Sequence, residues 1–504
     1  MIMPDAPRKI NPPHFNPPLD IVGGSNFGRS PKINASRTYN MIISDGFLVD
    51  SYGYVFVGKL GVIEGRSIFG STKGNFLLAV VDNIVYRVTV AKNINIEFDP
   101  VSAQKVGEIG SFSGGVFIAD NDVSQMAICD KSRLYIYNYA TNVFEQAVLP
   151  SGVIPGYVIY KNSSFIIVDL LTNFWYISEP GDGLNWFWGP SGTPVQGAIQ
   201  TKPDLGVAVI SIPGAGNNIL VMGHTVGEPW TNVPSTLFPY QRSTSSNIDY
   251  GCISSETIAT LDNLTVWLSG NETSGPVISA LRGGSLEQIS TDGYNFRFSQ
   301  LTHPQMSCAF FIRIAGHLLY QLTFYHPDDN FSLIYDFTTQ QFFDATDENL
   351  DHHIFRDVAR LDGRYYGVSL NDGNIYQLDE KTYVYDYGPR GNFEKPRIRI
   401  TSNIRALNNF RFCLNRVTIL IEQGNDPNII IPEPSYQPRV EMAVSKNGGY
   451  DYSYTAHREL QRLGKRQNIT RFDRLGSGNE FVLKFRFRSK GPINVGEGLA
   501  DIWQ

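Results

Sequence analysis

The strongest constraint on the fold of this chain is a hairpin pattern that recurs loosely from about Gly61 to Asp386. In each copy an apolar strand leads into a turn rich in Asp, Asn or Gly, and an aromatic strand follows. Asp-Asn and Asp-Gly pairs tolerate the positive φ angles of a two-residue turn, and the aromatic residues pack across the two strands. The copies cover residues 76–88, 126–137, 165–177, 258–268, 310–320, 358–368 and 371–378.

The spacing of these hairpins indicates a β-propeller. Most copies recur roughly every 40–50 residues, which is the length of a four-stranded propeller blade. The gap between the copies at residues 165 and 258 is about twice as long, as if one further copy were disguised there. The pattern leaves the number of blades open, and an irregular double β-sandwich is the alternative.

Length and composition agree with a chain that is almost entirely β-structure. The 504 residues are too many for one ordinary core, so we expect two or three domains or one large repetitive domain. The 47 Gly and 28 Pro, together with 26 Tyr and 31 Phe, are typical of many short strands joined by turns. Helical periodicity is scarce, and the best candidate is one short turn near Ser299 to Gln305.

Changes in composition divide the chain into three parts. Residues 1–35 are rich in Pro, and because Pro withholds a donor and fixes φ, both helix and central strand are disfavoured there. We therefore predict an extended N-terminal arm with the first strands over residues 1–60, and a β-propeller-like domain over residues 61–390. Charged and apolar residues alternate from Lys395 to Ile400, which favours a C-terminal antiparallel β-sandwich over residues 391–504. The predicted fold class is all-β.

Most enzyme signatures are missing from the sequence. It contains no Gly-rich phosphate-binding loop, no His-Glu-x-x-His motif and no Cys-x-x-Cys pair. No apolar stretch approaches the ~20 residues of a membrane span. We expect a protein that is not an enzyme, with no catalytic residue, no metal site and no cofactor. Four widely spaced cysteines are expected to be buried free thiols, namely Cys129, Cys252, Cys308 and Cys413.

Charge is unevenly distributed along the chain. Between Lys395 and Lys490 there are 18 Lys and Arg against 8 Asp and Glu, whereas the rest of the chain has 24 against 40. An acidic body joined to a basic end suggests separate surfaces for separate neighbours. Ordinary solvated strand faces are the alternative interpretation.

The basic end includes a strand, residues 481–488, in which apolar and charged residues alternate. Because side chains alternate across a strand, the apolar set is predicted to face a core and the other set to face outward. The outer set is mostly cationic, so it can hold a negatively charged partner. The core set is Phe481, Leu483, Phe485 and Phe487, and the outer set is Lys484, Arg486 and Arg488 with Val482.

The order of motifs in the last sixty residues resembles that of a phage family. A Ser-x-Asn-Gly-Gly turn begins at Ser445, Leu-x-x-Leu-Gly-Lys covers residues 460–465, and Thr-Arg-Phe-Asp-Arg-Leu-Gly covers residues 470–476. This order resembles the packaged-DNA stabilisation proteins of short-tailed, P22-like phages, which are tail hub or nozzle subunits. The chain length, the hairpin-rich body and residues 40–46 (Asn-Met-Ile-Ile-Ser-Asp-Gly) are also similar.

The resemblance implies a structural virion protein of the tail, assembled in the host cytoplasm. It implies a homo-hexameric ring below the portal and its adaptor, which closes and extends the DNA channel and helps to retain packaged DNA until ejection. The expected partners are the portal-adaptor (head completion) ring, a tail needle or plug, tailspikes or fibres, and double-stranded DNA in transit.

Electrostatics then suggests what the basic end binds. A strongly cationic channel would trap DNA through counterion release, so basic patches suit protein contacts better than the channel wall. We therefore predict that cations of the C-terminal region contact acidic neighbouring subunits or the adaptor ring. The protein-interface candidates are Arg462, Lys465, Arg466, Arg471, Arg474, Lys484, Arg486 and Arg488.

One motif favours a different function. Residues 445–452 resemble the Asp-box turn (Ser-x-Asp-x-Gly-x-x-Trp) of sialidase propellers, and residues 290–296 are a looser echo. The Asp-box is a folding turn, and a sialidase also needs catalytic residues that converge at the ring centre. A carbohydrate-binding or glycan-cleaving propeller at the virion surface is the alternative function, and an intracellular propeller scaffold is a third.

Overall fold

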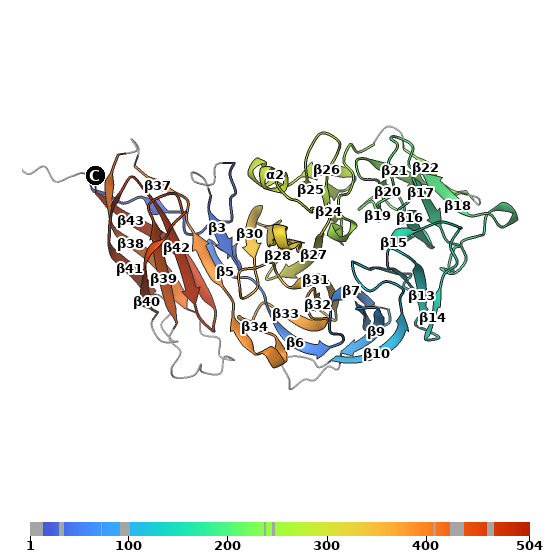
Figure 1. Cartoon of the computed structure of the whole chain (residues 1–504), viewed down its shortest axis with the longest axis horizontal. Coiled ribbons are helices and arrows are strands. Elements are labelled where there is room, and N and C mark those ends of the chain that lie inside the picture. Colours follow the sequence, from blue (N-terminus) through green and yellow to red (C-terminus); the bar gives the residue numbers. More distant parts are fainter. Residues whose placement is uncertain are drawn as a thin grey trace, which may run out of the picture. The chain divides into compact units, whose positions relative to one another are not determined.

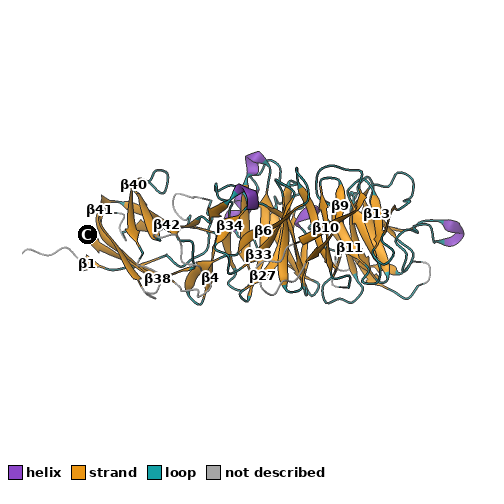
Figure 2. Cartoon of the chain, turned by 90° about the horizontal axis from the view of Figure 1, so that it is seen from below, coloured by secondary structure: helices purple, strands orange, loops and turns teal. Residues whose placement is uncertain are grey.

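The computed structural model describes residues 14–29, 35–71, 73–90, 101–235, 238–243, 247–406, 410–423, 438–460 and 468–503. Over these residues the chain consists almost entirely of β-strands joined by loops, and the helices are few and short (Figure 2). Contacts divide the chain into two compact units. The propeller unit is Tyr52–Thr338 with Ala345–Phe393, and the sandwich unit is Met1–Ser51 with Thr339–Asp344 and Glu394–Gln504.

The described strands of the propeller unit form seven sheets that follow one another along the chain, antiparallel except for the parallel pair of β34 and β6 (Figure 1). The first sheet consists of β7 (Gly65–Ser71), β8 (Phe76–Val81), β9 (Ile84–Val90) and β10 (Val101–Glu108). The second consists of β11 (Phe117–Asp120), β12 (Gln125–Cys129), β13 (Leu134–Asn138) and β14 (Val143–Gln146). The third consists of β15 (Pro155–Lys161), β16 (Ser164–Asp169), β17 (Phe174–Ile177) and β18 (Val195–Ala198).

The remaining four sheets continue the same arrangement. The fourth sheet consists of β19 (Ala208–Ser211), β20 (Ile219–Met222), β21 (Gly227–Asn232) and β22 (Tyr240–Arg242), and the fifth of β23 (Ala259–Leu261), β24 (Leu264–Ser269), β25 (Val277–Arg282) and β26 (Ser285–Gln288). The sixth consists of β27 (Ser307–Ile314), β28 (His317–Phe324) and β29 (Phe331–Asp336). The seventh consists of β31 (Phe355–Leu361), β32 (Arg364–Ser369) and β33 (Asn374–Asp379) with β6 (Gly53–Lys59) and β34 (Val384–Asp386). Each sheet is one blade, so the propeller prediction is confirmed and the blade number over the described residues is seven.

Tight turns between consecutive strands of the blades explain why the hairpins were visible in the sequence. Asp82 and Asp262 have φ angles of 54° and 53°, the left-handed conformation that Asp adopts more readily than most residues. Asp362 and Gly363 form a turn with φ angles of 50° and 83°. The paired φ > 0 values match the two-residue turn that suits the right-handed twist of the flanking strands.

The disguised copy expected between residues 165 and 258 is the fourth blade, β19–β22. Its strand β20 is fully buried, like the second strand of other blades. The turn that follows β20 spans residues 223–226 and contains Gly-His-Thr-Val instead of an Asp-Asn or Asp-Gly pair. Because the turn signal is missing while the burial pattern is kept, only the spacing revealed this blade.

The seventh blade closes the ring by pairing segments from opposite ends of the propeller sequence. Strand β6 pairs antiparallel with β33, with Tyr54 opposite Leu378 and Phe56 opposite Tyr376. Residues 53–59, which we had predicted among the first strands of the arm, are therefore the strand that completes the last blade. Pairing of the first and last strands removes the open edges that a sheet would otherwise expose.

Helical structure differs from the prediction. The α-helix of the described chain is α2 (Asp292–Phe298), whereas we predicted a short turn near Ser299 to Gln305. Tyr294 and Phe298 are buried and give the helix its apolar side. The looser Asp-box echo at residues 290–296 lies at the start of this helix, so it is not a hairpin turn. Four short 3-10 turns are η1 (Pro190–Gly192), η2 (Ser255–Thr257), η3 (Pro327–Asp329) and η4 (Gly388–Arg390).

The sandwich unit contains two sheets. The first is β4 (Met41–Ser44), β5 (Phe47–Asp50), β43 (Ile493–Trp503), β38 (Phe412–Gln423) and β41 (Asn468–Gly478), with β1 (His14–Phe15) and β2 (Pro18–Leu19) also paired to β43. The second is β3 (Arg37–Tyr39), β36 (Arg397–Ile400), β42 (Glu480–Arg488), β39 (Arg439–Ser445) and β40 (Ser453–Glu459), with β37 (Ile404–Arg405) paired to β42. Two short strands, β30 (Gln341–Ala345) and β35 (Asn392–Glu394), lie where the chain passes from one unit to the other.

One apolar core joins the two sheets of the sandwich unit. Phe412 of the first sheet packs against Phe481 of the second with ring centroids 5.1 Å apart, and Phe472 packs against Phe485 at 6.4 Å. The predicted inward set of β42 is confirmed, because all four of its apolar side chains are fully buried in this core. Burial of aromatic side chains from both sheets is the main force that holds this unit together.

The described part of the N-terminal arm is extended, as predicted, and it packs on its own chain. Pro18 and Leu19 pair with Leu499 and Gly498 of β43, and Ile21 is fully buried. The described cysteines are free; three are buried as expected, whereas Cys413 is exposed. Among the described residues there is no helix whose length and apolar character would let it cross a membrane.

Candidate functional site

The axis of the propeller contains a cavity of about 390 Å³. The first strand of six of the seven blades lines it, including Ile68 of β7, Ile118 of β11, Val158 of β15 and Phe310 of β27. Most of these side chains are apolar. Several polar and charged lining residues lie where β7 and β31 begin, and we call this end of the cavity its mouth.

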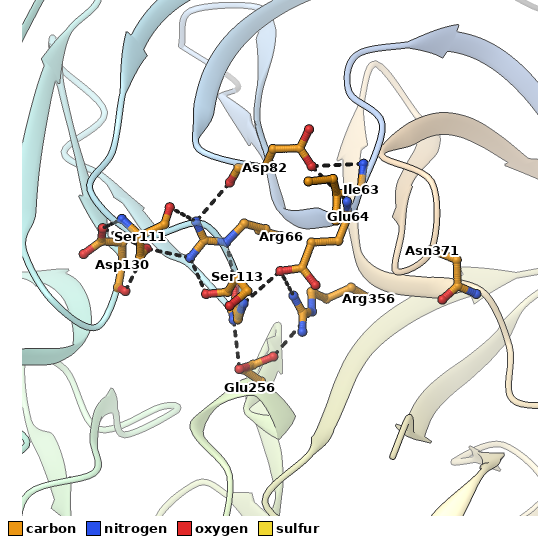
Figure 3. A network of polar contacts seen from close by, with 12 residues as sticks. Ile63, Glu64, Arg66, Asp82, Ser111, Ser113, Asp130, Glu256, Arg356 and Asn371 are labelled. Carbon is orange, nitrogen blue, oxygen red and sulfur yellow. Dashed lines mark hydrogen bonds and ion pairs between the residues drawn. The ribbon is translucent and has the colours of Figure 1, made fainter. Parts of the chain in front are cut away.

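Arg66 organises this mouth (Figure 3). Its side chain is 1% exposed, and it donates five hydrogen bonds, which is the full donor capacity of a guanidinium group. Nε bonds the Gly114 carbonyl at 2.7 Å, Nη1 bonds the carbonyls of Asp82 and Ser111 at 3.0 and 2.7 Å, and Nη2 bonds the Ser113 carbonyl at 2.9 Å and the Ser111 hydroxyl at 2.8 Å. Arg66 therefore fixes the loop at residues 109–116 that joins the first two blades.

A second guanidinium group, Arg356, lies between two carboxylates at the same mouth (Figure 3). Its Nε is 3.5 Å from Glu256 Oε2, and its Nη1 is 3.6 Å from Glu64 Oε1. Lys131 Nζ lies 2.8 Å from Glu256 Oε1. Gly115 N also donates to Glu256. Four blades or blade junctions are thus tied together by one network of charges.

Electrostatics keeps this network ionised. Burial raises the pKa of Glu256, but Arg356 and Lys131 outweigh burial and hold the pKa below its ordinary value. Burial lowers the pKa of Arg356, but Glu256 together with Tyr325, Cys308 and Glu64 outweighs it, so this pKa lies above its ordinary value. Both groups therefore stay charged, and the mouth of the cavity is lined by oppositely charged side chains that pair with one another.

The predicted cationic strand face exists, but its charges are partly neutralised within the chain. Arg488 lies between Glu441 (Nε to Oε1, 2.8 Å) and Glu394 (Nη1 to Oε2, 3.1 Å). Lys484 Nζ lies 5.6 Å from the centre of the Tyr452 ring. Arg486 is half-buried and has no charged partner among the described residues. Of these three candidates, Arg486 is the cation best placed to meet an external acid.

The other predicted candidates lie on a different sheet or outside the described residues. Arg471 and Arg474 are exposed on β41, which pairs with β38 in the first sheet, whereas Lys484, Arg486 and Arg488 are on β42 in the second. The two strands contribute to one core from different sheets, and Arg474 lies at the edge where β41 meets β40. The described candidates therefore form two separate basic sets, one on β41 and one on β42. Arg462, Lys465 and Arg466 lie outside the described residues.

A cleft of about 280 Å³ lies in the sandwich unit and is lined from β39, β40 and β41. Three cations line it, Lys446, Arg458 and Arg474, against one acid, Asp473. Arg458 packs over the Phe472 ring, with 5.3 Å between the guanidinium carbon and the ring centre, and its Nε donates to the Arg471 carbonyl. The cleft thus offers fixed positive charge in a small concave site, which suits a carboxylate-bearing segment.

Three cations that sequence reasoning counted among the basic surface are buried. Lys395, Arg397 and Arg399 alternate along the entry to β36, and their side chains are 0% exposed. Lys395 Nζ lies 3.1 Å from Asp50 Oδ1, Arg397 Nε donates to the same carboxylate, and Arg399 pairs with Asp20 Oδ2 at 2.9 Å. These cations therefore clamp the N-terminal segment onto the sandwich. No local signal in the sequence distinguishes them from solvated residues.

Burial and charge determine how these groups titrate. Burial raises the pKa of Asp50, but Arg397 and Lys395 outweigh it and bring the pKa below its ordinary value. Burial lowers the pKa of Lys395 to about 8, and Asp50 only partly opposes that shift. The cluster thus holds one carboxylate between two cations inside the protein.

The motif that resembled an Asp-box is a hairpin turn in the sandwich unit. It joins β39 to β40, and Asn447 Oδ1 accepts from the Asp451 amide at 3.1 Å. Ser445 Oγ accepts from the Gly449 amide at 2.9 Å. These bonds show a turn that stabilises itself, as an Asp-box does, and the motif belongs to no blade of the propeller.

Seven consecutive sheets around an axial cavity define the propeller unit as a seven-bladed β-propeller. A family model described as "Bacteriophage P22 Gp10, beta-propeller" matches residues 30–315, which is more than half of the chain. The chain belongs to this family of phage packaged-DNA stabilisation proteins, and its role is that of a phage structural protein. A search of curated proteins finds no match.

Two solved structures that match this chain have little sequence in common with it. A chain in "Crystal Structure of Mitotic Checkpoint Complex" is 12% identical, with 75% of this chain and 98% of that chain covered and a TM-score of 0.38. A chain in "Structure of U3-55K" is 7% identical, with 65% and 98% covered and a TM-score of 0.38.

Proposed function

We propose that this protein is a subunit of the phage tail hub, or nozzle, a homo-hexameric ring below the portal and its adaptor. In this role it extends the DNA channel and helps to retain packaged DNA until ejection. The portal-adaptor ring, a tail needle or plug, and tailspikes or fibres are its partners in the virion. Membership of the packaged-DNA stabilisation family supports a structural role in the particle. Retention and passage of DNA require shape and charge, not catalysis.

The observation that carries the proposal is the basic cleft on the sandwich unit of an otherwise acidic chain. Lys446, Arg458 and Arg474 gather in a concave site, while the chain outside residues 395–490 carries 24 Lys and Arg against 40 Asp and Glu. Each subunit therefore has both a basic cleft that can bind carboxylates and an excess of acidic residues elsewhere. Complementary charges of this kind set the register between neighbouring subunits.

The propeller axis is too small to be the DNA path. Its cavity is about 390 Å³, and the side chains of Arg66, Glu256 and Arg356 line one mouth of it. A B-DNA double helix is wider than its own major groove, which is about 12 Å wide. DNA that passes this protein must therefore run outside each propeller, which supports a channel enclosed by several subunits.

Charge also separates the docking role from the channel role. A wall that neutralises many phosphates binds DNA tightly through counterion release, and such a wall would hinder ejection. Basic residues engaged by neighbouring subunits are withdrawn from DNA. The proposal therefore assigns Arg471, Arg474 and Arg486 to protein contacts.

The decisive experiment reverses the accessible charges. The double variant Arg474→Glu/Arg486→Glu changes one cation in each basic set and leaves the internally paired Arg488 intact. Purified protein is mixed with portal-adaptor complexes, and rings are counted by negative-stain microscopy. The wild type is expected to form rings, and the double variant is expected to lose them while its melting temperature is retained. The matched control, Arg133→Glu, changes an exposed arginine of the propeller unit and is expected to assemble.

Two results would contradict the proposal. Full ring assembly by the folded double variant would show that these cations are not part of an interface. Absence of rings with the wild type, together with binding to a glycan array or glycan hydrolysis, would favour the carbohydrate-directed alternative.

A further inference from the structure

Two histidines and one aspartate come together on the propeller unit, and none of them lines the axial cavity. His303 lies in the loop that precedes β27, while His326 and Asp328 lie just after β28, at the 3-10 turn η3. One potential ligand atom from each residue lies within 4.8 Å of the other two. Because loops on either side of the β27–β28 hairpin supply these residues, the cluster is formed only when the sixth blade is folded.

The two imidazole rings are stacked. Their centroids are 3.7 Å apart and their planes differ by 24°. A neutral imidazole has one ring nitrogen with a lone pair that an ion can accept. Neutral imidazole is the form that binds a metal ion.

Hydrogen bonds select which nitrogen of His303 is free to bind. Asp329 accepts from the Thr302 hydroxyl at 3.0 Å and from the His303 amide at 2.6 Å. Since the Thr302 proton is used in that bond, its oxygen accepts the Nδ1–H of His303, 3.0 Å away. The lone pair of His303 is therefore on Nε2. A carboxylate that orients a histidine ligand through a second group is a common feature of metal sites.

His326 and Asp328 complete the donor set. His326 Nδ1 accepts from the Asp328 amide at 3.3 Å, so the lone pair of this ring is on Nδ1, where a bound ion would replace the amide as its partner. The Asp328 carboxylate lies 3.6 Å from the same nitrogen, and its side chain is 70% exposed, so it can turn toward an ion without unfolding the loop.

We propose that His303, His326 and Asp328 bind one divalent transition-metal ion, Zn²⁺ foremost. Two imidazole nitrogens and one carboxylate suit Zn²⁺, Co²⁺, Ni²⁺ or Cu²⁺, whereas Ca²⁺ and Mg²⁺ prefer all-oxygen ligands. Binding turns the stacked rings so that their lone pairs converge on the ion. The ion then ties the loop before β27 to the loop after β28, and a fourth position remains for water or a ligand from a neighbouring subunit.

The test uses the full-length protein after treatment with a chelator. Calorimetric titration with ZnCl₂ is expected to show one ion per chain, and Co²⁺ is expected to give the visible absorption bands of a tetrahedral site. His303→Ala and His326→Ala are each expected to weaken binding at least tenfold. Thr302→Val keeps all three ligands but removes the group that orients His303, and is expected to weaken binding about 10- to 100-fold. His224→Ala, an exposed histidine outside the cluster, is the matched control.

Three outcomes would overturn the proposal. One is the absence of stoichiometric Zn²⁺ binding by the wild type. Another is unchanged affinity in His303→Ala and His326→Ala, which would show that the ion binds elsewhere. The third is an equal loss in His224→Ala. Asp328→Asn changes an exposed side chain, so a weakened affinity in this variant, with an unchanged melting temperature, separates loss of a ligand from loss of folding. Ring assembly is not measured, so failure here leaves the hub proposal untouched.

Discussion

Tyr54 and Tyr387 lie 333 residues apart in the sequence, and the hydroxyl of Tyr54 donates to that of Tyr387 at 2.6 Å. Tyr387 in turn donates to the Glu348 carboxylate. Tyr54 is fully buried, and its ring is stacked on Tyr385 with centroids 4.5 Å apart and edge-on to Tyr376 at 5.4 Å. An aromatic cluster thus holds β6 in the seventh blade where the propeller closes.

Truncation of Tyr54 is expected to weaken ring closure. Tyr54→Ala removes the whole ring from the cluster and is expected to lower the free energy of unfolding by about 3–5 kcal/mol, as for other buried aromatic residues. Tyr54→Phe removes one hydrogen bond and is expected to cost about 1 kcal/mol. Urea unfolding followed by tryptophan fluorescence measures this, because five of the six tryptophans lie in the propeller unit. Equal effects of the two variants would contradict the packing role of the ring.

Removal of the Asp50 charge is expected to destabilise the sandwich unit strongly. Asp50→Asn leaves Lys395 and Arg397 buried without a counter-charge, which costs about 3–5 kcal/mol. Thermal unfolding of the sandwich unit is the measurement. Asp45→Asn, an exposed residue in the turn after β4, is the control and is expected to stay within about 0.5 kcal/mol of the wild type. A small effect of Asp50→Asn would mean that water reaches the cluster.

The stability of the sandwich unit is expected to rise with pH in the alkaline range because of Lys395. Burial lowers its pKa from 10.5 to about 8 in the folded protein. Between these two values the unfolded chain binds the proton more tightly, so the free energy of unfolding rises from pH 8 towards pH 10.5, by on the order of 3 kcal/mol. Below pH 8 the group is charged in both states and contributes no slope.

Comparison with Lys395→Met isolates this contribution. Every other titrating group is shared, so the difference in unfolding free energy between wild type and variant reports Lys395 alone. The difference is expected to shift in favour of the wild type as the pH rises through this window. A difference independent of pH would show that the pKa of Lys395 is close to its ordinary value.

Replacement of Arg66 is expected to loosen the loop at residues 109–116. Lysine offers three donors where Arg66 uses five, so Arg66→Lys leaves at least two buried acceptors unpaired, at a cost of roughly 1–3 kcal/mol each. Hydrogen exchange of the amides in this loop is expected to accelerate. Arg133→Lys, an exposed arginine, provides the control. Unchanged exchange in Arg66→Lys would indicate that Glu64 and Glu256 hold the loop without it.

Local interactions explain which parts of the fold were predictable. The hairpins depend on neighbours in sequence, such as the turn at Asp82 between β8 and β9, so composition and spacing were enough to predict propeller blades. The fourth blade lacks the turn signal and was inferred only from the gap. The pairing of β6 with β33 connects segments more than 300 residues apart, and no local pattern encodes it.

The basic end shows the same limit at the level of the site. Alternation correctly predicted the inward face of β42, because that pattern is intrinsic to one strand. The burial of Lys395, Arg397 and Arg399 was not predictable in this way, because their partners Asp50 and Asp20 come from the other end of the chain. Likewise, Arg474 and Arg486 were grouped by sequence proximity, whereas their strands belong to different sheets.

The position of β6 has a consequence for the order of synthesis. Tyr54 leaves the ribosome 324 residues before its partner Leu378, which at about 5–20 residues per second is a wait of roughly 15–65 s. During that time β6 has no partner and the growing array of blades has an open edge. The sandwich unit also combines early and late residues. Neither unit can be completed before its late residues have been synthesised, so a chain that stops short of them cannot finish folding either unit.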